Sequence, residues 1–499
     1  MQEINEQNIR LIFGLKLRQL RMDNELSLSD LSKKTGISVS YLNEIEKGKK
    51  YPKADKIAAL AEQFEVTYDW LVSLQLGKKL APIADLIRSN ILNELPLEIF
   101  GIEPVELINL LMTTPTKFNA FISTLIEIGR NYDMGVENFY YSVLRTYQEM
   151  NENYFDELER QVDKFYQQFH LTKDEILEHK HLEKILIEDF GVKISYTLQD
   201  THNSLRDLRS LLVPGKQPML LLNKYLTSEQ KAFILAKEIG YIFLKLDTRE
   251  YAGSMLEVNS FEKVLNNFRA AYFAGALLIR EKAITTDIKT LFNNEKWSPD
   301  DFTSIIKKYH CTPEVFFHRM TNILPKHFGL KQLFFLRFTR NEENKDISLT
   351  KEMHLAGLHN PHATALNQHY CRRWLSLTLM DDLEELKKTG KSIYPILKAQ
   401  KSRYINGENE YLLFTVAMPR PGTKTVNYSI SIGILINSKL RKTIKFSNDE
   451  RINTRMVNET CERCPAVDCN ERAAPPLVLN HEQKIKQMKS AIDRLMSRT

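Results

Sequence analysis

The chain has 499 residues, of which 43% are hydrophobic and 26% charged, with a formal net charge of +6. Length and composition predict a soluble globular protein of three or four domains. They exclude a membrane-spanning protein, because no apolar run is long enough, and the first residues lack a signal-peptide pattern. We therefore expect a cytoplasmic protein with no membrane partner. Five cysteines in such a chain predict reduced thiols or metal ligands, not disulfides.

Residues 26–52 predict two short helices joined by a tight turn. Ser27 or Ser29 can cap the first helix, and Gly36 can end it with a positive φ. Ser38 can then cap the second helix. This is the helix-turn-helix layout, in which the second helix enters the major groove of DNA.

The segment LRQLR…LSLSDLSKKTGIS…SYLNEIEKGKKYP…KIAALAEQF resembles the XRE/Cro-type repressor DNA-binding domain over residues 9–72. The alternative is a small helical domain that binds a protein. Residues 1–76 hold 11 Lys and Arg against 11 Asp and Glu, but the lysines cluster beside the second helix, where phosphate contact needs them. The residues expected to contact DNA are Ser29, Ser38, Ser40, Tyr41, Asn43, Glu44, Lys47, Lys49 and Lys50.

Residues 77–170 are predicted to be a helical connector after a linker at Gly77–Lys79. Within it, Val136–Phe169 predicts one long amphipathic helix with apolar residues spaced by threes and fours. Such a stripe either packs in the core of its own chain or contacts a second copy. We favour a homodimer contact, because repressors of this type read two half-sites of an inverted repeat.

Residues 171–330 predict short strands at 194–196 and 219–222, followed by two helices, Ser228–Leu244 and Val264–Arg280. The first helix resembles the active-site helix of ImmA/IrrE-type zinc peptidases, which carries H-E-x-x-H. Here residues 237–241 read KEIGY, and residues 266–270, where the family has its third ligand, hold no carboxylate. The resemblance therefore implies a zincin-like domain without metal ligands, and a protein that is not an enzyme.

The altered positions predict a different use for this site. Lys237 and Tyr241 are one helical turn apart, and Arg269 or Tyr272 can approach from the next helix. Lysine, tyrosine and arginine together suit an anionic small molecule. The alternative is that these four side chains fill or bridge a structural core.

Beyond residue 330 the pattern changes to strands at 333–339, 411–418 and 426–436. The last of these alternates apolar and polar residues, which predicts a half-buried antiparallel strand. Four histidines between the strands are irregularly spaced, and we interpret them as surface or hydrogen-bonded residues: His354, His359, His362 and His369. A basic amphipathic helix over residues 481–499 is expected to pack back on the body.

A cluster of cysteines lies near the end of the chain. Cys461, Cys464 and Cys469 can converge on one cation, and Cys371 can supply a fourth thiolate. Zinc and iron–sulfur clusters both accept four thiolates, so the spacing leaves both open. The alternative is a set of incidental thiols. Cys311 has no cysteine neighbour and is interpreted as a structural thiol.

The combination of the Cro-type start, the degenerate ImmA/IrrE-like centre and the C-x-x-C-P…C ending resembles the bacterial short-chain fatty-acid metabolism regulators. This group includes the propionate-catabolism and glyoxylate regulators, and the resemblance covers nearly the full chain. It implies a DNA-binding transcriptional regulator that senses acyl-CoA. It also favours a cluster of the 4Fe–4S type at the cysteines, with zinc as the alternative. The rival interpretations are an ImmA/IrrE-type metallopeptidase acting on a repressor and a phage-type repressor without a ligand.

The predicted fold is multidomain, α + α/β. A helix-turn-helix domain that is all α occupies residues 1–76, and the helical connector occupies 77–170. A zincin-like α+β domain without metal ligands follows at 171–330. A C-terminal α+β sensor domain with the cysteine cluster and the terminal helix completes the chain at 331–499.

Overall fold

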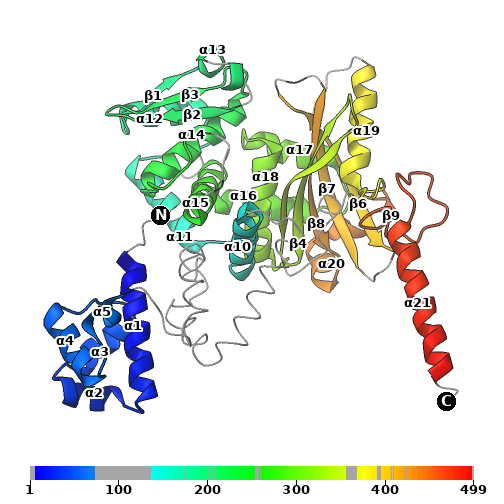
Figure 1. The fold of residues 1–499 in the computed structure, drawn as a ribbon. Coiled ribbons are helices and arrows are strands. Elements are labelled where there is room, and N and C mark those ends of the chain that lie inside the picture. The colour runs from blue at the N-terminus through cyan, green and yellow to red at the C-terminus, as the bar shows by residue number, and fades with distance from the viewer. Residues whose placement is uncertain are drawn as a thin grey trace. The chain divides into compact units, whose positions relative to one another are not determined.

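A computed structural model of the chain describes residues 6–73 and 136–496, except 173–174, 202, 206–207, 253–257, 259, 356–367, 390–394, 406, 408, 422 and 424 (Figure 1). Contacts divide the chain into two compact units. One is Met1–Val143 with Asn259–Phe261, and the other is Leu144–Val258 with Glu262–Thr499. The predicted linker and the connector helices before residue 136 lie outside the described residues, as do His359 and His362.

The first unit contains a five-helix domain whose core is shared by all its helices. The helices are α1 (Glu6–Asp23), α2 (Leu28–Thr35), α3 (Val39–Glu46), α4 (Ala54–Gln63) and α5 (Tyr68–Val72). Leu17 of α1, Leu42 and Ile45 of α3, and Leu60 of α4 are fully buried in that core. Burial of this apolar face stabilises short helices that would be marginal alone.

The long helix predicted at Val136–Phe169 is wrong. The chain forms two helices, α10 (Val136–Met150) and α11 (Asp156–Gln168). Glu152 and Asn153 between them adopt left-handed φ values of 51° and 52°, which an α-helix cannot contain. Asn153 is held there because its amide donates to the hydroxyl of Thr321 at 2.8 Å. The apolar stripe of α11 lies in the core of this chain and is not a free dimer surface.

A small mixed sheet follows, with strand order β1-β3-β2. The strands are β1 (Lys193–Ser195), β2 (Ser210–Val213) and β3 (Met219–Leu222), with β1 parallel and β2 antiparallel to β3. The sequence predicted β1 and β3 but not β2, because a strand of four residues shows too little alternation. Helix α12 (His179–Glu188) precedes β1, and two short helical segments connect β1 to β2: α13 (Leu198–Thr201) and η2 (Asn203–Leu205).

The two predicted central helices are present as α14 (Ser228–Phe243) and α15 (Phe261–Leu278). Thr227 and Gln230 form a capping box at the start of α14, which fixes that end of the helix. Further helices lead into the C-terminal sheet: α16 (Glu281–Phe292), α17 (Pro299–Lys308), α18 (Pro313–Ile323) and η3 (Leu324–Phe328).

The C-terminal sheet has six strands in the order β5-β4-β8-β7-β6-β9 (Figure 1). All neighbours are antiparallel except β6 and β9. The strands are β4 (Leu333–Asn341), β5 (Ile347–His354), β6 (Ile396–Tyr404), β7 (Glu410–Pro419), β8 (Val426–Leu435) and β9 (Thr454–Val457). Helix α19 (Leu375–Lys388) covers one face, and α17 and α18 pack on the other. Residues of both predicted domains, 171–330 and 331–499, share the larger core.

The expectation of a half-buried strand at 426–436 is wrong, because β8 is buried on both faces. Its polar residues Ser429 and Ser431 are fully buried, as are its isoleucines. The Ser431 hydroxyl lies 2.7 Å from that of Ser376 on α19 and 2.8 Å from that of Thr415 on β7. The alternation therefore marks a strand that presents small polar residues to α19, of which Ser431 is hydrogen-bonded, and apolar residues to the core on the side of α18.

The chain continues through α20 (Ser438–Thr443) and η5 (Lys445–Asn448) to β9, and then to the terminal helix α21 (Leu477–Met496). The helix was expected to pack on the body, but none of its residues is buried. Within the described part of the chain, every helix is too short or too polar to span a bilayer.

Candidate functional site

The turn between α2 and α3 has the predicted caps. Ser27 accepts a hydrogen bond from the Asp30 amide and forms a capping box with it, while Gly36 ends α2 at a φ of 68°. Ser38 accepts from the Tyr41 amide and caps α3. Of the two proposed caps for α2, Ser27 fills the position and Ser29 is exposed. These local bonds set the angle at which α3 leaves the turn.

Two contacts with α1 fix the position of α3, and the sequence did not predict either. A Cβ added at Gly14 would lie 2.3 Å from the carbonyl oxygen of Ile45, so α1 and α3 can approach only because residue 14 is glycine. Arg21 donates to both carboxylate oxygens of the buried Glu46, at 2.6 and 2.9 Å. A bidentate pair of this kind fixes both the distance between α1 and α3 and the rotation of one helix relative to the other.

Of the nine residues predicted to contact DNA, eight lie on α3 or beside its ends, and Ser29 lies on α2. Ser38 and Ser40 are exposed, and Tyr41, Asn43 and Glu44 are partly exposed. Val39, which was not predicted, is 43% exposed between the two serines. A methyl-bearing side chain at the start of the helix can contact the methyl group of thymine.

Five lysines follow α3, and some of them are already paired. Lys50 lies 2.8 Å from the carboxylate of Glu44, and this bond lowers the pKa of Glu44. Lys56 lies 3.7 Å from Asp55. Among the described residues, Lys47, Lys49 and Lys53 have no ion pair in the domain, and Lys47 and Lys49 are exposed beside α3. Lys47 and Lys49 are therefore the first candidates for contact with DNA phosphates.

The positions that hold zinc in the resembled peptidases do come together. Lys237 donates to the side-chain oxygen of Asn267 at 2.6 Å, and the Tyr241 hydroxyl lies 3.3 Å from the same oxygen. The Asn267 oxygen therefore links the two positions on α14 to the third position, on α15. Burial lowers the pKa of Lys237 to about 8, with Arg209, Arg249 and Lys351 adding to the effect.

Glu238, which is the glutamate of the family motif, also has a partner within the chain. Arg249 donates to both carboxylate oxygens of Glu238 at 2.7 Å, and both side chains are buried. The Arg249 guanidinium also stacks on the Tyr241 ring, 3.7 Å from its centroid. A carboxylate held in this way accepts hydrogen bonds from its own chain and is not poised to activate a water molecule.

The four residues predicted to bind a ligand, Lys237, Tyr241, Arg269 and Tyr272, do not form one site. Tyr272 lies in a separate buried network, where its hydroxyl donates to Glu159 at 2.8 Å. Glu159 also accepts two bonds from the fully buried Arg319, at 2.5 and 2.9 Å. Arg269 is partly exposed on α15. Tyr272 therefore has the structural role that was the alternative interpretation.

A polar pocket of about 400 Å³ lies between the small sheet and the turn that joins β7 to β8. Its volume is in the range typical of small-ligand sites. The lining residues are Gln199, Asp200, Arg209, Asn223, Lys224, Tyr225, Leu226, Gln230, Arg420, Pro421 and Thr423.

The charge of this pocket is positive. Lys224 pairs with Asp200 at 3.0 Å, which leaves the guanidinium groups of Arg209 and Arg420 as its net charge. Gln199 accepts from the Lys224 amide at 3.2 Å, but its own amide nitrogen is buried without a partner among the described residues. A buried donor without an acceptor is costly, and an anionic ligand oxygen would satisfy it.

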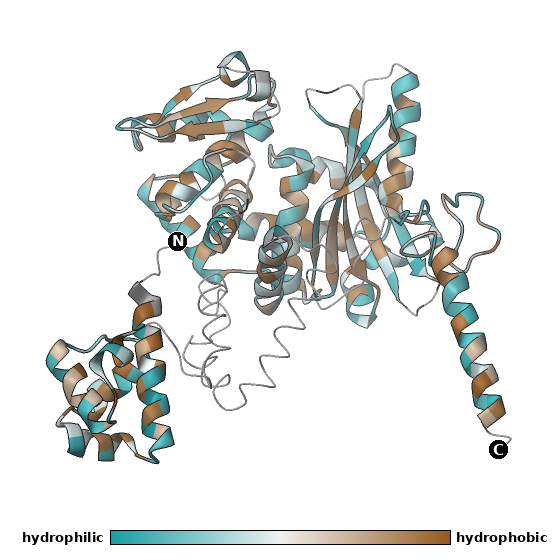
Figure 2. Cartoon of the chain, in the orientation of Figure 1, coloured by the Kyte–Doolittle hydropathy of each residue, from teal (hydrophilic) through white to brown (hydrophobic). Residues whose placement is uncertain are grey.

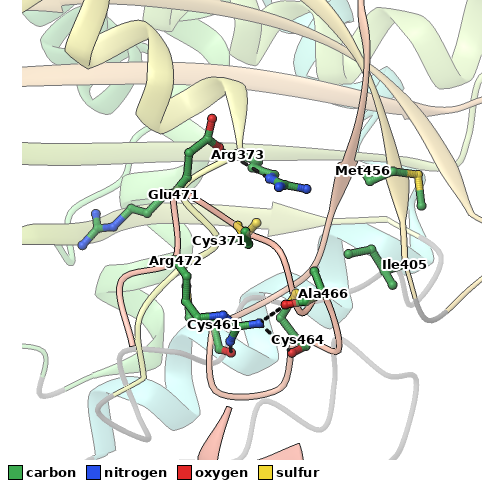
Figure 3. Close-up of a pocket in the computed structure, with 11 residues that line it drawn as sticks. Cys371, Arg373, Ile405, Met456, Cys461, Cys464, Ala466, Glu471 and Arg472 are labelled. Atoms are coloured by element: carbon green, nitrogen blue, oxygen red, sulfur yellow. Dashed lines mark hydrogen bonds and ion pairs between the residues drawn. The ribbon is translucent and has the colours of Figure 1, made fainter. Parts of the chain in front are cut away.

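Cys371, Cys461, Cys464 and Cys469 line a second pocket (Figure 3). Backbone hydrogen bonds bring Cys371 beside the 461–469 loop. The Cys371 amide donates to the carbonyl of Glu459 at 3.1 Å, and the Cys461 amide donates to the carbonyl of His369 at 2.8 Å. Cys371, Cys461 and Cys464 are buried, and burial raises the pKa of Cys371. Cys311 is buried elsewhere in the larger core.

Arginines surround the cysteine pocket. Arg472 donates to the carbonyls of Cys461, Cys464 and Ala466, at 2.7, 3.0 and 2.5 Å, which closes the loop on itself (Figure 3). Arg372 and Arg373 also line the pocket, so cations are present to offset thiolate charge.

The donor set of this pocket fits a thiolate-bound metal group, but the donors are not prearranged. Within the part of the chain that the structure describes, no three His, Cys, Asp or Glu side chains stand close enough to hold a metal ion. The free space between the cysteines is about 10 Å³, room for one water-sized sphere. Binding of a metal group there would therefore require the cysteine side chains to move closer together.

Comparisons with known proteins identify two of the regions. A helix-turn-helix family model matches residues 17–71. Residues 17–71 are a helix-turn-helix domain. The IrrE N-terminal-like domain model matches residues 187–321, so an IrrE-like domain occupies the centre of the chain.

Other comparisons are more distant. A solved structure of a Mycobacterium tuberculosis transcriptional regulator is similar, with 15% identity and a TM-score of 0.48. The similarity covers 67% of this chain and 93% of that chain. No curated protein matches the chain. The narrower resemblance to short-chain fatty-acid regulators therefore stays a prediction.

Proposed function

We propose that the chain is a transcriptional regulator that binds an inverted repeat in duplex DNA as a homodimer. The observation that carries this proposal is the surface of α3, where polar side chains at the helix start stand beside exposed lysines. Base edges are read from the first turn of such a helix, and lysines contact the phosphates on either side. Gly14 and the Arg21–Glu46 pair hold this surface in place.

The DNA interface has two kinds of contact, and substitutions should separate them. Asn43→Ala is expected to weaken binding to the preferred operator about tenfold or more and to relax preference at one base position. Lys49→Ala is expected to weaken binding to all sequences and to reduce the slope of log affinity against log salt by about one.

Fluorescence anisotropy with a selected operator and a scrambled duplex measures both effects. Lys34→Ala, on α2, is a matched control for the charge change alone. Operator binding that survives deletion of residues 1–72 would contradict the proposed function.

We propose further that an anionic metabolite controls this regulator and binds in the 400 Å³ pocket. Acyl-CoA is the candidate, by resemblance to the fatty-acid regulators. The net charge of Arg209 and Arg420 and the unpartnered amide of Gln199 support an anion there. Arg209 also lowers the pKa of Lys237, so the pocket and the former metal site share one positive field.

Two arginines of this pocket should carry the binding energy. Arg209→Ala and Arg420→Ala are each expected to weaken acyl-CoA binding by about tenfold to a hundredfold, because each removes a charged hydrogen-bond donor. Isothermal titration calorimetry measures the change, and Arg160→Ala, an exposed arginine of α11, is the control. Unchanged affinity in both variants, together with loss in Lys237→Ala, would return the ligand to the originally predicted site.

We propose that the IrrE-like domain is not a peptidase and that the four pocket cysteines hold a metal group. The hydrogen bonds of Lys237 and Tyr241 to Asn267 support the first statement, since a protonated lysine has no lone pair for zinc. The shared pocket of the four thiols supports the second. The resemblance favours a 4Fe–4S cluster, with a zinc ion as the alternative at the same cysteines. When bound, either group would cross-link residue 371 to the 461–469 loop.

A further inference from the structure

The terminal helix α21 has an apolar stripe without a partner in this chain. None of its residues is buried over Leu477–Met496, and apolar residues recur along it (Figure 2). Met488, Ile492 and Leu495 are 56%, 51% and 67% exposed, and Ile485 is 39% exposed. An isolated helix of this length is marginal in water, so its stability calls for packing of the stripe.

The stripe has the spacing of a coiled coil. Positions spaced alternately by three and four residues run through it, and all of them are apolar except His481: Val478, His481, Ile485, Met488, Ile492 and Leu495. A repeat of this kind matches a second helix that packs lengthwise, in preference to a flat or concave surface. The apolar stripe of α11, the other candidate for a dimer contact, is already buried in its own core. Of these two helices, α11 belongs to the predicted dimer contact and α21 was expected to pack on the body, but α21 is the one whose stripe is exposed.

Charges beside the stripe distinguish two ways of pairing α21 with a copy of itself. Glu482 and Lys489 flank it on one side, and Lys484 and Ala491 flank it on the other. In a parallel pair, Lys484 would face Lys489 of the second copy twice, and like charges repel. In an antiparallel pair, Glu482 would face Lys489 of the second copy twice, and opposite charges attract.

We propose that α21 pairs with α21 of a second copy in an antiparallel two-helix coiled coil. Ile485 then packs opposite Met488 of the second copy, and Val478 packs opposite Leu495. This pairing has twofold symmetry, as an inverted repeat in DNA does. The inference rests on the homodimer of the proposed function and assigns the surface that makes it.

Substitutions in the stripe test the contact itself. Analytical ultracentrifugation of the full chain should show a dimer, and Ile485→Asp/Ile492→Asp should shift it to monomer, with Kd raised at least a hundredfold. Both residues are exposed in the single chain, so their change leaves the fold intact, which circular dichroism verifies. Ser490→Asp adds the same charge on the opposite side of the same helix and should leave the dimer unchanged.

Charge reversal tests the direction. Lys489→Glu should raise the dimer Kd roughly tenfold in the antiparallel arrangement, because Glu482 then faces a second carboxylate across the helix pair. Adding Glu482→Lys should restore the affinity. In a parallel arrangement Lys489→Glu would instead tighten the dimer, because Lys484 would gain an opposite charge, and that result would overturn the proposal.

The outcomes separate this inference from the proposed function. A dimer that survives Ile485→Asp/Ile492→Asp, or a wild-type chain that is monomeric, overturns the coiled coil. Operator binding by the wild-type chain is measured independently, so it can hold while the coiled coil fails. Conversely, a coiled coil that behaves as expected in a chain without operator binding would refute only the proposed function.

Discussion

Gly14→Ala is expected to abolish specific DNA binding while the unit from Leu144 onward stays folded. The added Cβ would lie 2.3 Å from the carbonyl oxygen of Ile45 and 3.0 Å from that of Glu46. Both atoms belong to backbone at the end of α3, which cannot rotate away as a side chain can. The domain must therefore lose about 1–3 kcal/mol of stability or move α3 away from α1.

Thermal unfolding and operator binding measure the two results together. Gly275→Ala, within α15, is the matched control, because its added Cβ meets no atom within 4 Å. That change should stabilise the chain by up to about 1 kcal/mol, as expected for an open helical position. If Gly14→Ala binds the operator and melts as the wild-type chain does, then α1 and α3 do not meet at this point.

Local signals were predictable in the helix-turn-helix domain, and tertiary contacts were not. Ser27, Gly36 and Ser38 act within four residues of themselves, so their roles can be read from neighbouring sequence. Gly14 matters only because α1 crosses α3, and Arg21 reaches Glu46 across 25 positions. No spacing rule within one helix signals either contact.

The same distinction explains the former metal site. The loss of zinc ligands at 237 and 241 could be read from the motif, because both lie on one helix. The hydrogen-bond partner shared by residues 237 and 241, Asn267, lies on the next helix, and the partner of Glu238 lies 11 positions downstream. The predicted ligand pocket failed because Tyr272 faces Glu159 and not Lys237.

Periodicity alone misled three predictions about packing. The spacing of apolar residues over 136–169 continues across the end of one helix and the start of the next. Residues 152 and 153, between the two helices, have left-handed φ values that the spacing does not reveal. In β8 the polar face looked solvent-exposed, because serine is common on surfaces as well as beneath a helix. The stripe of α21 signals a partner but does not say whether that partner is in the same chain.

Cys464→Ser is expected to remove the metal group of the protein. Cys371 and the loop cysteines line one pocket although about 90 residues separate them, and a group bound by four thiolates cannot survive loss of a buried ligand. Because metal binding stabilises only the folded arrangement of the ligands, the melting temperature should fall by several degrees. Elemental analysis and absorbance of anaerobically purified protein provide the measurement.

The controls assign the metal to this pocket and identify it. Cys311→Ala and Glu238→Gln should leave the metal content unchanged, because neither residue lines the pocket. Brown protein with iron, sulfide and a broad visible absorbance indicates a cluster, and colourless protein with one zinc per chain indicates a zinc site. Wild-type protein without metal, or metal that persists in both Cys464→Ser and Cys371→Ser, contradicts the proposal.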